Sequence, residues 1–454
     1  MHCSIITARF TGVFFLLMPA LLMAQGQQGS GSPYSAYGLG DLSGASQISQ
    51  ATMGGISMAV VDPVSVVSAN PASYAFLQRT TFEQGLVFRT SKYDTESAKA
   101  LGGRTDLLGL TLGIPFGRGR WGMALGLNPV SNVGYRIDNL QPNPTGTGSI
   151  TYRYTGDGGL NRAFLGVGHA FSEKRDSLNN GHRFSIGANL GYVFGRIEEV
   201  RQAIYPQGTG YYGSNVYSSL VLRDPIGNIG LMYQGDLLRR TTKSDKPLYF
   251  MAGAAIELPS NLGARRTDLV NSFGVTSTGV QFPVDTALYT EGARGTVGLP
   301  VGLGVGFTVF NQKWTVSAEV KQRDWRKLTL KVEDYTLPSR LATSTTYSLG
   351  ASFRPAEERG GNFWQRTTYR TGFRYNNDYL VVDDHQLQEI GMSFGLSMPV
   401  LGSTTRSRFN FGAELGQRGT TDNGLIKERY ASWYIGFTIT PDIREQWFKK
   451  RRIE

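Results

Sequence analysis

The sequence predicts an all-β fold, a transmembrane antiparallel β-barrel of about 14 strands with an N-terminal hatch or plug. Three observations predict this fold. Apolar residues alternate strictly with small or polar ones along many segments, which is the period of a strand with one apolar face. Glycine contributes 58 of the 454 residues, and Tyr 22 and Phe 24 supply most of the aromatic residues. Apart from one N-terminal stretch, no segment is apolar enough for a membrane-spanning helix.

That stretch, Phe10–Met23, follows Arg9 and precedes Ala24, which is typical of a secretory signal peptide. We expect cleavage after Ala24, so that residues 1–24 form the signal peptide and the mature chain reaches the cell outer membrane. The only cysteine, Cys3, lies within this peptide, so we expect no disulfide or thiolate metal site. The formal net charge is +11, but the basic residues are dispersed along an exported chain. We therefore expect no nucleic-acid partner.

The alternation is clearest in the segments 108–114, 121–127, 390–398 and 433–439. A soluble β-sandwich would show the same period, but the runs are longer than the usual strand of about 5 to 6 residues. The apolar faces begin or end in aromatic residues, as a membrane-interface girdle requires: Trp121, Trp314, Tyr347, Tyr369 and Trp433. The opposite faces carry charge in mid-strand: Glu83, Arg89, Glu319, Lys321, Arg374 and Glu414. A barrel turns the apolar faces to lipid and these charges to a wet lumen.

The turn signals divide residues 80–440, the predicted transmembrane barrel, into about fourteen strands, with sixteen as the alternative. The predicted strands are 80–92, 104–117, 119–136, 149–171, 181–203, 215–236, 247–275, 280–311, 313–325, 344–355, 366–376, 387–398, 405–418 and 430–440. Short turns such as Gly117–Gly119 and Asn311-Gln312 are expected on the periplasmic side, and the connectors 326–343 and 377–386 on the extracellular side.

Residues 25–79 do not alternate, and they are too apolar for a disordered tail. We expect them to fold inside the barrel as a plug, because irregular backbone at membrane depth needs protein or a wet cavity around it. Residues 441–454 form a basic tail that should lie in the periplasm. There Trp447 and Phe448 can rest at the interface while Lys449–Arg452 meet lipid phosphates or a protein partner, or the tail is simply a solvated charge run.

Within the plug, Gly54-Gly55, Ala59-Val60-Val61-Asp62-Pro63 and Asn70-Pro71-Ala72 precede the first strand. This arrangement resembles the FadL family of outer-membrane transporters, in particular its Bacteroidetes-type branch. Two further segments are similar to that branch, Ser32–Gly40 near the mature N-terminus and Gly158-Gly159-Leu160-Asn161 before a strand. Two features depart from the family pattern, because Ser73 stands where Asn-Pro-Ala is usually followed by glycine and the barrel does not end on a terminal aromatic residue.

The resemblance implies a channel for passive uptake of hydrophobic small molecules, fatty-acid-like or aromatic, gated by an N-terminal hatch. The alternative is an accessory barrel that docks with an outer-membrane secretion or assembly machine, so the expected partners are membrane lipid, a hydrophobic ligand, and an outer-membrane or periplasmic protein. The site residues we expect at the gate are Asn70, Pro71, Ala72, Gly54 and Gly55. Asn70-Pro71 makes a rigid turn with few hydrogen-bond donors, so it is either a ligand gate or a structural turn between plug and wall.

We expect no enzyme activity, cofactor or metal. The only cluster suited to acid–base chemistry, Asp383-Asp384-His385, falls in a predicted loop, where it is usually a solvated turn. The other histidines of the mature chain, His169 and His182, fall at lumen or interface positions, and no His and Glu spacing suits a metal.

Overall fold

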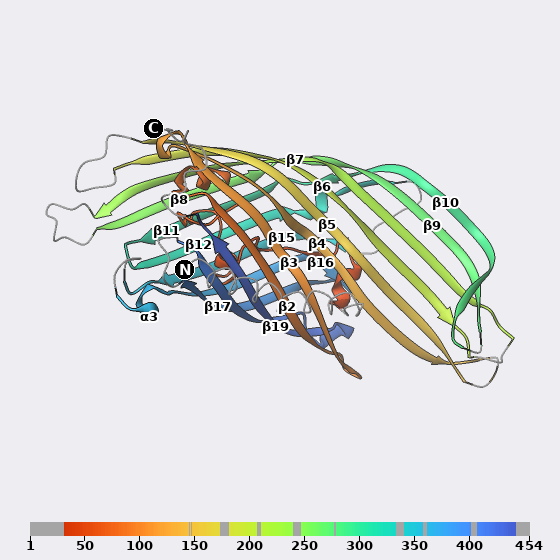
Figure 1. Ribbon diagram of the computed structural model, residues 1–454. Helices are drawn as coiled ribbons and strands as arrows, with labels where there is room; N and C mark the ends of the chain where they lie inside the picture. The colour runs from red at the N-terminus through yellow and green to blue at the C-terminus, as the bar shows by residue number, and fades with distance from the viewer. Residues whose placement is uncertain are drawn as a thin grey trace, which may run out of the picture.

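The computed structural model describes residues 31–441, except 145, 147, 173–180, 207–209, 239–246, 277, 333–339, 357–360 and 401–405. The expected signal peptide and almost all of the basic tail lie outside the described residues. The chain forms one antiparallel barrel, closed where β19 (Lys427–Ile439) pairs with β2 (Thr81–Asp94) (Figure 1). No helix among the described residues is long and apolar enough to cross a membrane.

The wall has fourteen strands when each interrupted strand is counted once, which confirms the lower of the two predicted counts. Ten are continuous and four are divided in two. In chain order after β2, the wall consists of β3 (Lys99–Phe116), β4 (Trp121–Pro142), β5 (Ser149–Ser172), β6 (Arg183–Ile204), β7 (Gly213–Leu238), β8 (Leu248–Glu257) with β9 (Ser260–Val275), β10 (Gln281–Leu299) with β11 (Gly302–Phe310), β12 (Trp314–Asp324) with β13 (Thr329–Val332), β14 (Arg340–Leu341) with β15 (Thr343–Phe353), β16 (Thr368–Val382), β17 (His385–Pro399), β18 (Arg408–Arg418) and β19.

The outer face of the wall is apolar and is bordered by aromatic side chains. At the end near the first and last wall residues, Trp121 stacks on Phe116 and Trp314 on Phe353. Toward the other end, the ring centres of Tyr347 and Tyr375 are 6.4 Å apart, and 56% of the surface of Trp433 is exposed. Leucine, valine and phenylalanine side chains between these borders are exposed as well. Such a band with two aromatic girdles is suited to a bilayer, so hydrocarbon covers the apolar faces.

The wall extends much further at one end than at the other. Strands β5, β6 and β7 have 24, 22 and 26 residues, whereas a tilted strand needs about 9–11 residues to span a bilayer. In Figure 1 these strands, with β9 and β10, extend beyond the rest of the barrel toward the right of the view. Bacterial barrels carry their longer projections outside the cell, so we assign this end as extracellular and the opposite end as periplasmic.

Three neighbouring strands are interrupted at one level of the wall. β8 and β9 are separated at Leu258-Pro259, β10 and β11 at Pro300-Val301, and the short 3-10 helix η4 (Trp325–Lys327) follows β12. Proline lacks the N–H that a sheet ladder needs, so Pro259 and Pro300 donate no ladder hydrogen bond at the first two breaks. The predicted strands 247–275 and 280–311 included no position for a break, and the structure divides each of them at these points.

The connector predicted at 377–386 is wrong, because β16 and β17 continue to a two-residue turn at Asp383-Asp384 with positive φ at both residues.

The barrel encloses the described part of the plug, residues 31–79. Its elements are η1 (Pro33–Ala36), the two-residue strand β1 (Asp41–Leu42), the helical turn α2 (Ile48–Ala51) and η2 (Pro71–Phe76). Plug side chains such as Tyr34, Ile56 and Tyr74 are at most 2% exposed because wall residues surround them. The predicted mid-strand charges face this plug, and Glu83, Glu319 and Glu414 are almost completely buried against it or against lumen neighbours.

Candidate functional site

The wall is split between two strands on its extracellular side. β3 and β4 pair only through Leu110–Phe116 and Trp121–Leu127. Beyond this short ladder, residues 99–109 of β3 pair with β2, and residues 128–142 of β4 pair with β5 and, at two positions, with β1. The two strands therefore diverge, and a segment of the plug takes the place of the missing ladder.

Plug strand β1 fills the split by pairing with β4. Asp41 lies opposite Asn132 and Leu42 opposite Ser131, and the N–H of Ser43 donates to the carbonyl of Val130 at 2.9 Å. This pairing is short, so backbone hydrogen bonds alone hold β1 weakly.

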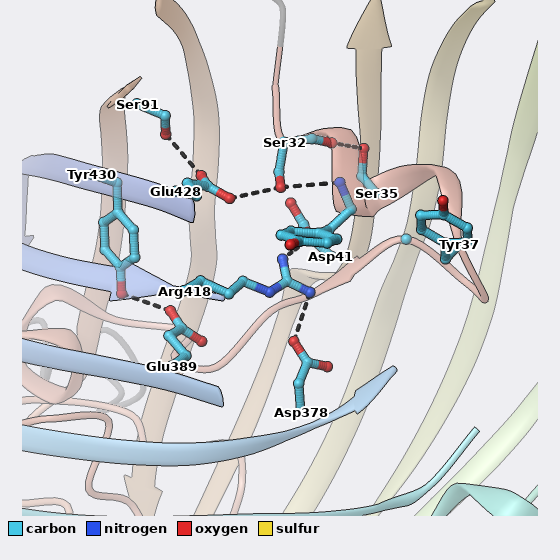
Figure 2. Close-up of polar contacts among 12 residues, drawn as sticks. Ser32, Ser35, Tyr37, Asp41, Ser91, Asp378, Glu389, Arg418, Glu428 and Tyr430 are labelled. Carbon is cyan, nitrogen blue, oxygen red and sulfur yellow. Dashed lines mark hydrogen bonds and ion pairs between the residues drawn. The ribbon is translucent and has the colours of Figure 1, made fainter. Parts of the chain in front are cut away.

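The side chain of Asp41 joins β1 to both sides of the lumen. Arg104 of β3 donates to Asp41 at 3.1 Å, and Arg418 of β18 donates to its other carboxylate oxygen at 2.6 Å. Arg418 also pairs with Asp378 of β16 at 2.6 Å, and Figure 2 shows its guanidinium between the two carboxylates (Figure 2). Across the split itself, Asn132 donates to Asp106 at 2.6 Å. We call the pairs of Asp41 with Arg104 and Arg418 the latch.

Burial raises the pKa of Asp41, but the charges of Arg418 and Arg104 act in the opposite direction and hold the pKa below its usual range. The carboxylate is therefore ionised at neutral pH, and both ion pairs of the latch are intact there.

The start of the plug is attached next to the latch. Ser32 donates to Glu428 of β19 at 2.7 Å, and Ser91 of β2 donates to the same carboxylate at 2.8 Å. The hydroxyl of Tyr34 donates to the carbonyl of Ile426 at 2.6 Å. Both contacts lie on the N-terminal side of β1, so they fix that flank of the strand.

Carboxylates anchor the part of the plug that follows β1 to the wall. Glu319 accepts from the N–H groups of Ser57 and Met58 at 2.6 and 2.5 Å, and Glu83 accepts from the N–H of Val66 at 2.7 Å. The plug contributes its own acid, Asp62, which lies 3.2 Å from Arg408 and 3.6 Å from Arg370. Buried hydrogen bonds to charged groups stabilise by about 1.5–3 kcal/mol each, so this half of the plug is firmly held.

The predicted gate residues lie in this firmly held half. Asn70 caps η2 by accepting from the N–H of Ala72 at 3.2 Å, and its amide donates to the carbonyl of Met58 at 2.6 Å. Asn70 and Ala72 are fully buried. A Cβ on Gly230 of β7 would lie 2.0 Å from Oδ1 of the Asn70 side chain, so this wall glycine allows the close approach.

Gly54 and Gly55 lie against a different part of the wall. Both have positive φ, and the N–H of Gly54 donates to Ser393 of β17 while its carbonyl accepts from Ser348 of β15 at 2.8 Å. The structure therefore places the two predicted motifs at separate contacts and does not bring them together around one cavity. Their role in gating stays a prediction.

A cavity of about 270 Å³ lies directly behind the split. Leu42, Ser43 and Pro129 line it on the side of the split. The plug residues Ala45, Met58 and Ala69 line part of the remainder. The wall contributes apolar, polar and charged side chains: Leu160, Val193, Ile226, Leu262, Leu299, Asn128, Gln322, Ser344, Thr346, Arg162, Glu257, Lys321 and Arg323. On the extracellular side of this cavity, the lumen is closed by a packed apolar cluster that includes Leu39, Leu222, Trp325 and Tyr379. A wider cavity of about 1390 Å³ lies on the periplasmic side of the plug.

The sequence did not single out Asp41, Arg104 or Arg418. The available signal was that Asp41 is the first acidic residue of the sequence, within a segment of small and apolar residues. Its partners lie 63 and 377 positions away in the sequence, so no local pattern connects them.

The histidine cluster occupies an exposed turn, where Asp384 pairs with Arg340 and both side chains are at least 80% exposed. Within the described ranges no group of three or more His, Cys, Asp or Glu side chains is arranged to hold a metal ion.

These features define a class of protein, an outer-membrane β-barrel with an internal plug. Its fold is similar to that of the Ralstonia pickettii toluene transporter TbuX, with 14% identity over 88% of this chain and 99% of that chain and a TM-score of 0.53. A deletion mutant of TodX, a Pseudomonas putida toluene transporter described as a monoaromatic hydrocarbon channel, gives 15% identity over 87% and 99% with a TM-score of 0.52. The predicted FadL-like fold is thereby confirmed.

Residues 8–454 match the BamG family model, and the chain belongs to this family. No curated protein matches it.

Proposed function

We propose that this protein is a channel for hydrophobic small molecules, in which β1 acts as a gate over the split between β3 and β4. The observation that carries the proposal is the cavity of about 270 Å³ behind the split, with plug residues Leu42 and Ser43 forming part of its wall. Displacement of β1 would connect this cavity to the outer surface of the barrel. The toluene transporters of similar fold support the choice of a hydrophobic substrate.

The predicted gate residues have a supporting part in this proposal. Asn70–Ala72 and Gly54-Gly55 hold the lower plug against the wall, so that movement is confined to the segment near the latch. The gate is then the segment that begins at Asp41, and the predicted motifs are its fixed base.

The proposal is tested with the fluorescent hydrophobic probe N-phenyl-1-naphthylamine in cells that produce the protein. Ser43 is exposed into the cavity, so Ser43→Trp should fill it without disturbing the wall and should reduce probe uptake to the level of cells without the protein. Glu96→Trp, in an exposed extracellular turn, is the matched control and should leave uptake unchanged. Equal uptake by the Ser43→Trp variant and the unchanged protein would contradict the proposal.

One observation favours a second candidate function, an accessory barrel that docks with an outer-membrane secretion or assembly machine. Strands β5, β6, β7 and β10 continue far beyond the bilayer, and the extension exposes apolar side chains such as Leu140, Phe282 and Leu288. Exposed apolar surface of this kind marks protein contacts. Affinity purification from native membranes followed by protein mass spectrometry tests it, and recovery of the protein without a stoichiometric membrane-protein partner would exclude it.

A further inference from the structure

Cations gather on the outer face of the barrel where β2 meets its two neighbours at the extracellular end. Asp94 of β2 lies opposite Lys427 of β19 on one side and opposite Lys99 of β3 on the other. In the next row toward the membrane, Lys92 likewise lies between residues of both neighbouring strands. Directly opposed residues of adjacent strands point to the same side of a sheet. We call the six residues of these two rows the cationic patch: Lys92, Asp94, Lys99, Leu101, Lys427 and Arg429.

The cationic patch faces away from the lumen. Arg429 is four residues from Trp433 on β19, and residues an even number apart on a strand share one face. Trp433 and its partner Phe88 are 56% and 37% exposed, so this is the lipid-facing side of the wall. The alternate residues point inward, since Glu428 accepts the hydrogen bond from Ser32 of the plug (Figure 2).

The cationic patch lies at the level of the lipid head groups. Trp433 belongs to the extracellular aromatic girdle, and tryptophan rests where hydrocarbon meets head groups. Arg429 and Lys92 are each four residues beyond the Trp433 and Phe88 pair. Four residues correspond to about 13 Å along a strand, and to about 9 Å in height at a tilt near 45°. Basic side chains at this height meet the phosphate groups of a bilayer.

The cationic patch carries an excess of positive charge. It has four cations and one acid, which gives a formal charge of +3, and Glu96 in the adjoining turn leaves +2. Arg429 lies 2.6 Å from Asp94 and Lys92 lies 3.8 Å from it, while their side chains stay 53% and 44% exposed. Asp94 therefore holds these cations together without neutralising the patch.

Small side chains separate the cationic patch from the aromatic girdle. Thr90 of β2 lies between Ala431 of β19 and Gly103 of β3, and these three residues form the row between the cations and the Trp433 level. Leu101, within the patch, is 81% exposed. A bulky head group can therefore lie close to the backbone below the cations, with its acyl chains along the apolar wall.

We propose that the cationic patch binds lipid A, the phosphorylated glycolipid of the outer leaflet, through its phosphate groups. The four cations are spread over three adjacent strands, about 10 Å across, which suits a head group with two phosphates better than one with a single phosphate. Arginine offers paired donors to phosphate oxygens, and lysine offers a compact charge. The row of small residues leaves room for the sugars. This inference goes beyond the proposed function and requires only that the barrel lies in an outer membrane.

The test measures binding of bisphosphorylated lipid A to the full-length protein in a non-ionic detergent by native mass spectrometry. Phosphatidylglycerol is the comparison, because it is an anionic lipid with one phosphate. Lys92→Gln combined with Arg429→Gln removes two cations and should weaken lipid A binding about 30-fold. Arg201→Gln combined with Arg340→Gln is the matched control and should leave binding unchanged, because each of these exposed extracellular arginines is paired with an acid. Heat-dependent electrophoretic mobility verifies that the variants are folded.

A second pair of substitutions, Lys99→Gln combined with Lys427→Gln, removes the other two cations and should weaken lipid A binding to a similar extent. Lipid A binding that both pairs leave unchanged, or that the unchanged protein lacks, would overturn the proposal. An equal loss in the control variant would overturn it as well, since the effect would then be one of overall charge. Phosphatidylglycerol bound as tightly as lipid A, with the same dependence on Lys92 and Arg429, would overturn the choice of lipid A. Uptake of N-phenyl-1-naphthylamine tests the channel separately from all of these results.

Discussion

Asp41→Asn should release β1 from the split while leaving the barrel folded. The substitution keeps the shape of the side chain but removes its charge. Arg418 retains Asp378 at 2.6 Å and Arg104 retains Asp106 at 2.9 Å, so neither guanidinium loses its last carboxylate. The loss is then that of charge-assisted hydrogen bonds, about 2–3 kcal/mol in total, rather than the larger penalty for an unpaired buried charge.

A loss of this size should increase the detached population of β1 about 30- to 150-fold. Hydrogen exchange measures this population, because the N–H of Ser43 is protected by its hydrogen bond to Val130. Exchange at Ser43 should accelerate by the same factor, and uptake of N-phenyl-1-naphthylamine should rise with it. Asp138→Asn is the matched control, because Asp138 forms an ion pair with Arg153 on the exposed extension, remote from the plug.

The pH dependence of the latch provides a second readout of the same reasoning. The folded state holds the pKa of Asp41 below its ordinary value of about 3.9, so the stabilisation is complete above that pH and is lost as the pH falls through the lowered pKa. Corrected for intrinsic rates, exchange at Ser43 should therefore be constant from about pH 5 to pH 8. Unchanged exchange in Asp41→Asn, or a marked pH dependence in this range, would refute the account of the latch.

Three further predictions follow from the plug. Deletion of residues 25–75 should make the barrel leaky to small solutes, and single-channel conductance equal to that of the intact protein would show that these residues do not obstruct it. Gly187→Ala should lower the free energy of unfolding of the barrel by about 1–3 kcal/mol, because the new Cβ would lie 2.4 Å from the Pro71 carbonyl. In the control Gly227→Ala the new Cβ meets the end of the Leu258 side chain at 3.3 Å, and this substitution should be tolerated. Glu319→Gln should make the plug more susceptible to limited proteolysis, because two plug N–H groups lose a charged acceptor; an unchanged cleavage rate would contradict the anchoring role.

The strands were predictable because alternation is a local property. Each wall strand carries its own apolar and small or polar faces, and fourteen such segments account for the whole wall. The prolines at the two breaks, Pro259 and Pro300, are a local signal against an unbroken ladder, but Pro225 lies inside the continuous strand β7, so proline alone did not locate the breaks.

The split and the latch could not be predicted in the same way. Residues 99–109 of β3 have the composition of a wall strand, and they pair with β2 on one side. Only the structure shows that β4 diverges from them, so that β4 does not pair with their other side. Asp41 becomes meaningful only when folding brings Arg104 and Arg418 to it. The predicted motif at Asn70 was visible because Asn-Pro is a local turn signal, and its packing against Gly230 depends on a strand that is distant in the sequence.

The central claim is that β1 must leave the edge of β4 before a molecule can pass. A disulfide between Leu42→Cys and Ser131→Cys tests it most directly, because these residues are partners in the β1–β4 register and the chain has only one native cysteine, Cys3. The control pair Asn139→Cys and Tyr152→Cys joins β4 to β5 on the extracellular extension. We predict that uptake of N-phenyl-1-naphthylamine is abolished in the oxidised Leu42→Cys and Ser131→Cys protein, returns on reduction, and is unaffected in the control. Full uptake through the oxidised protein would contradict the account.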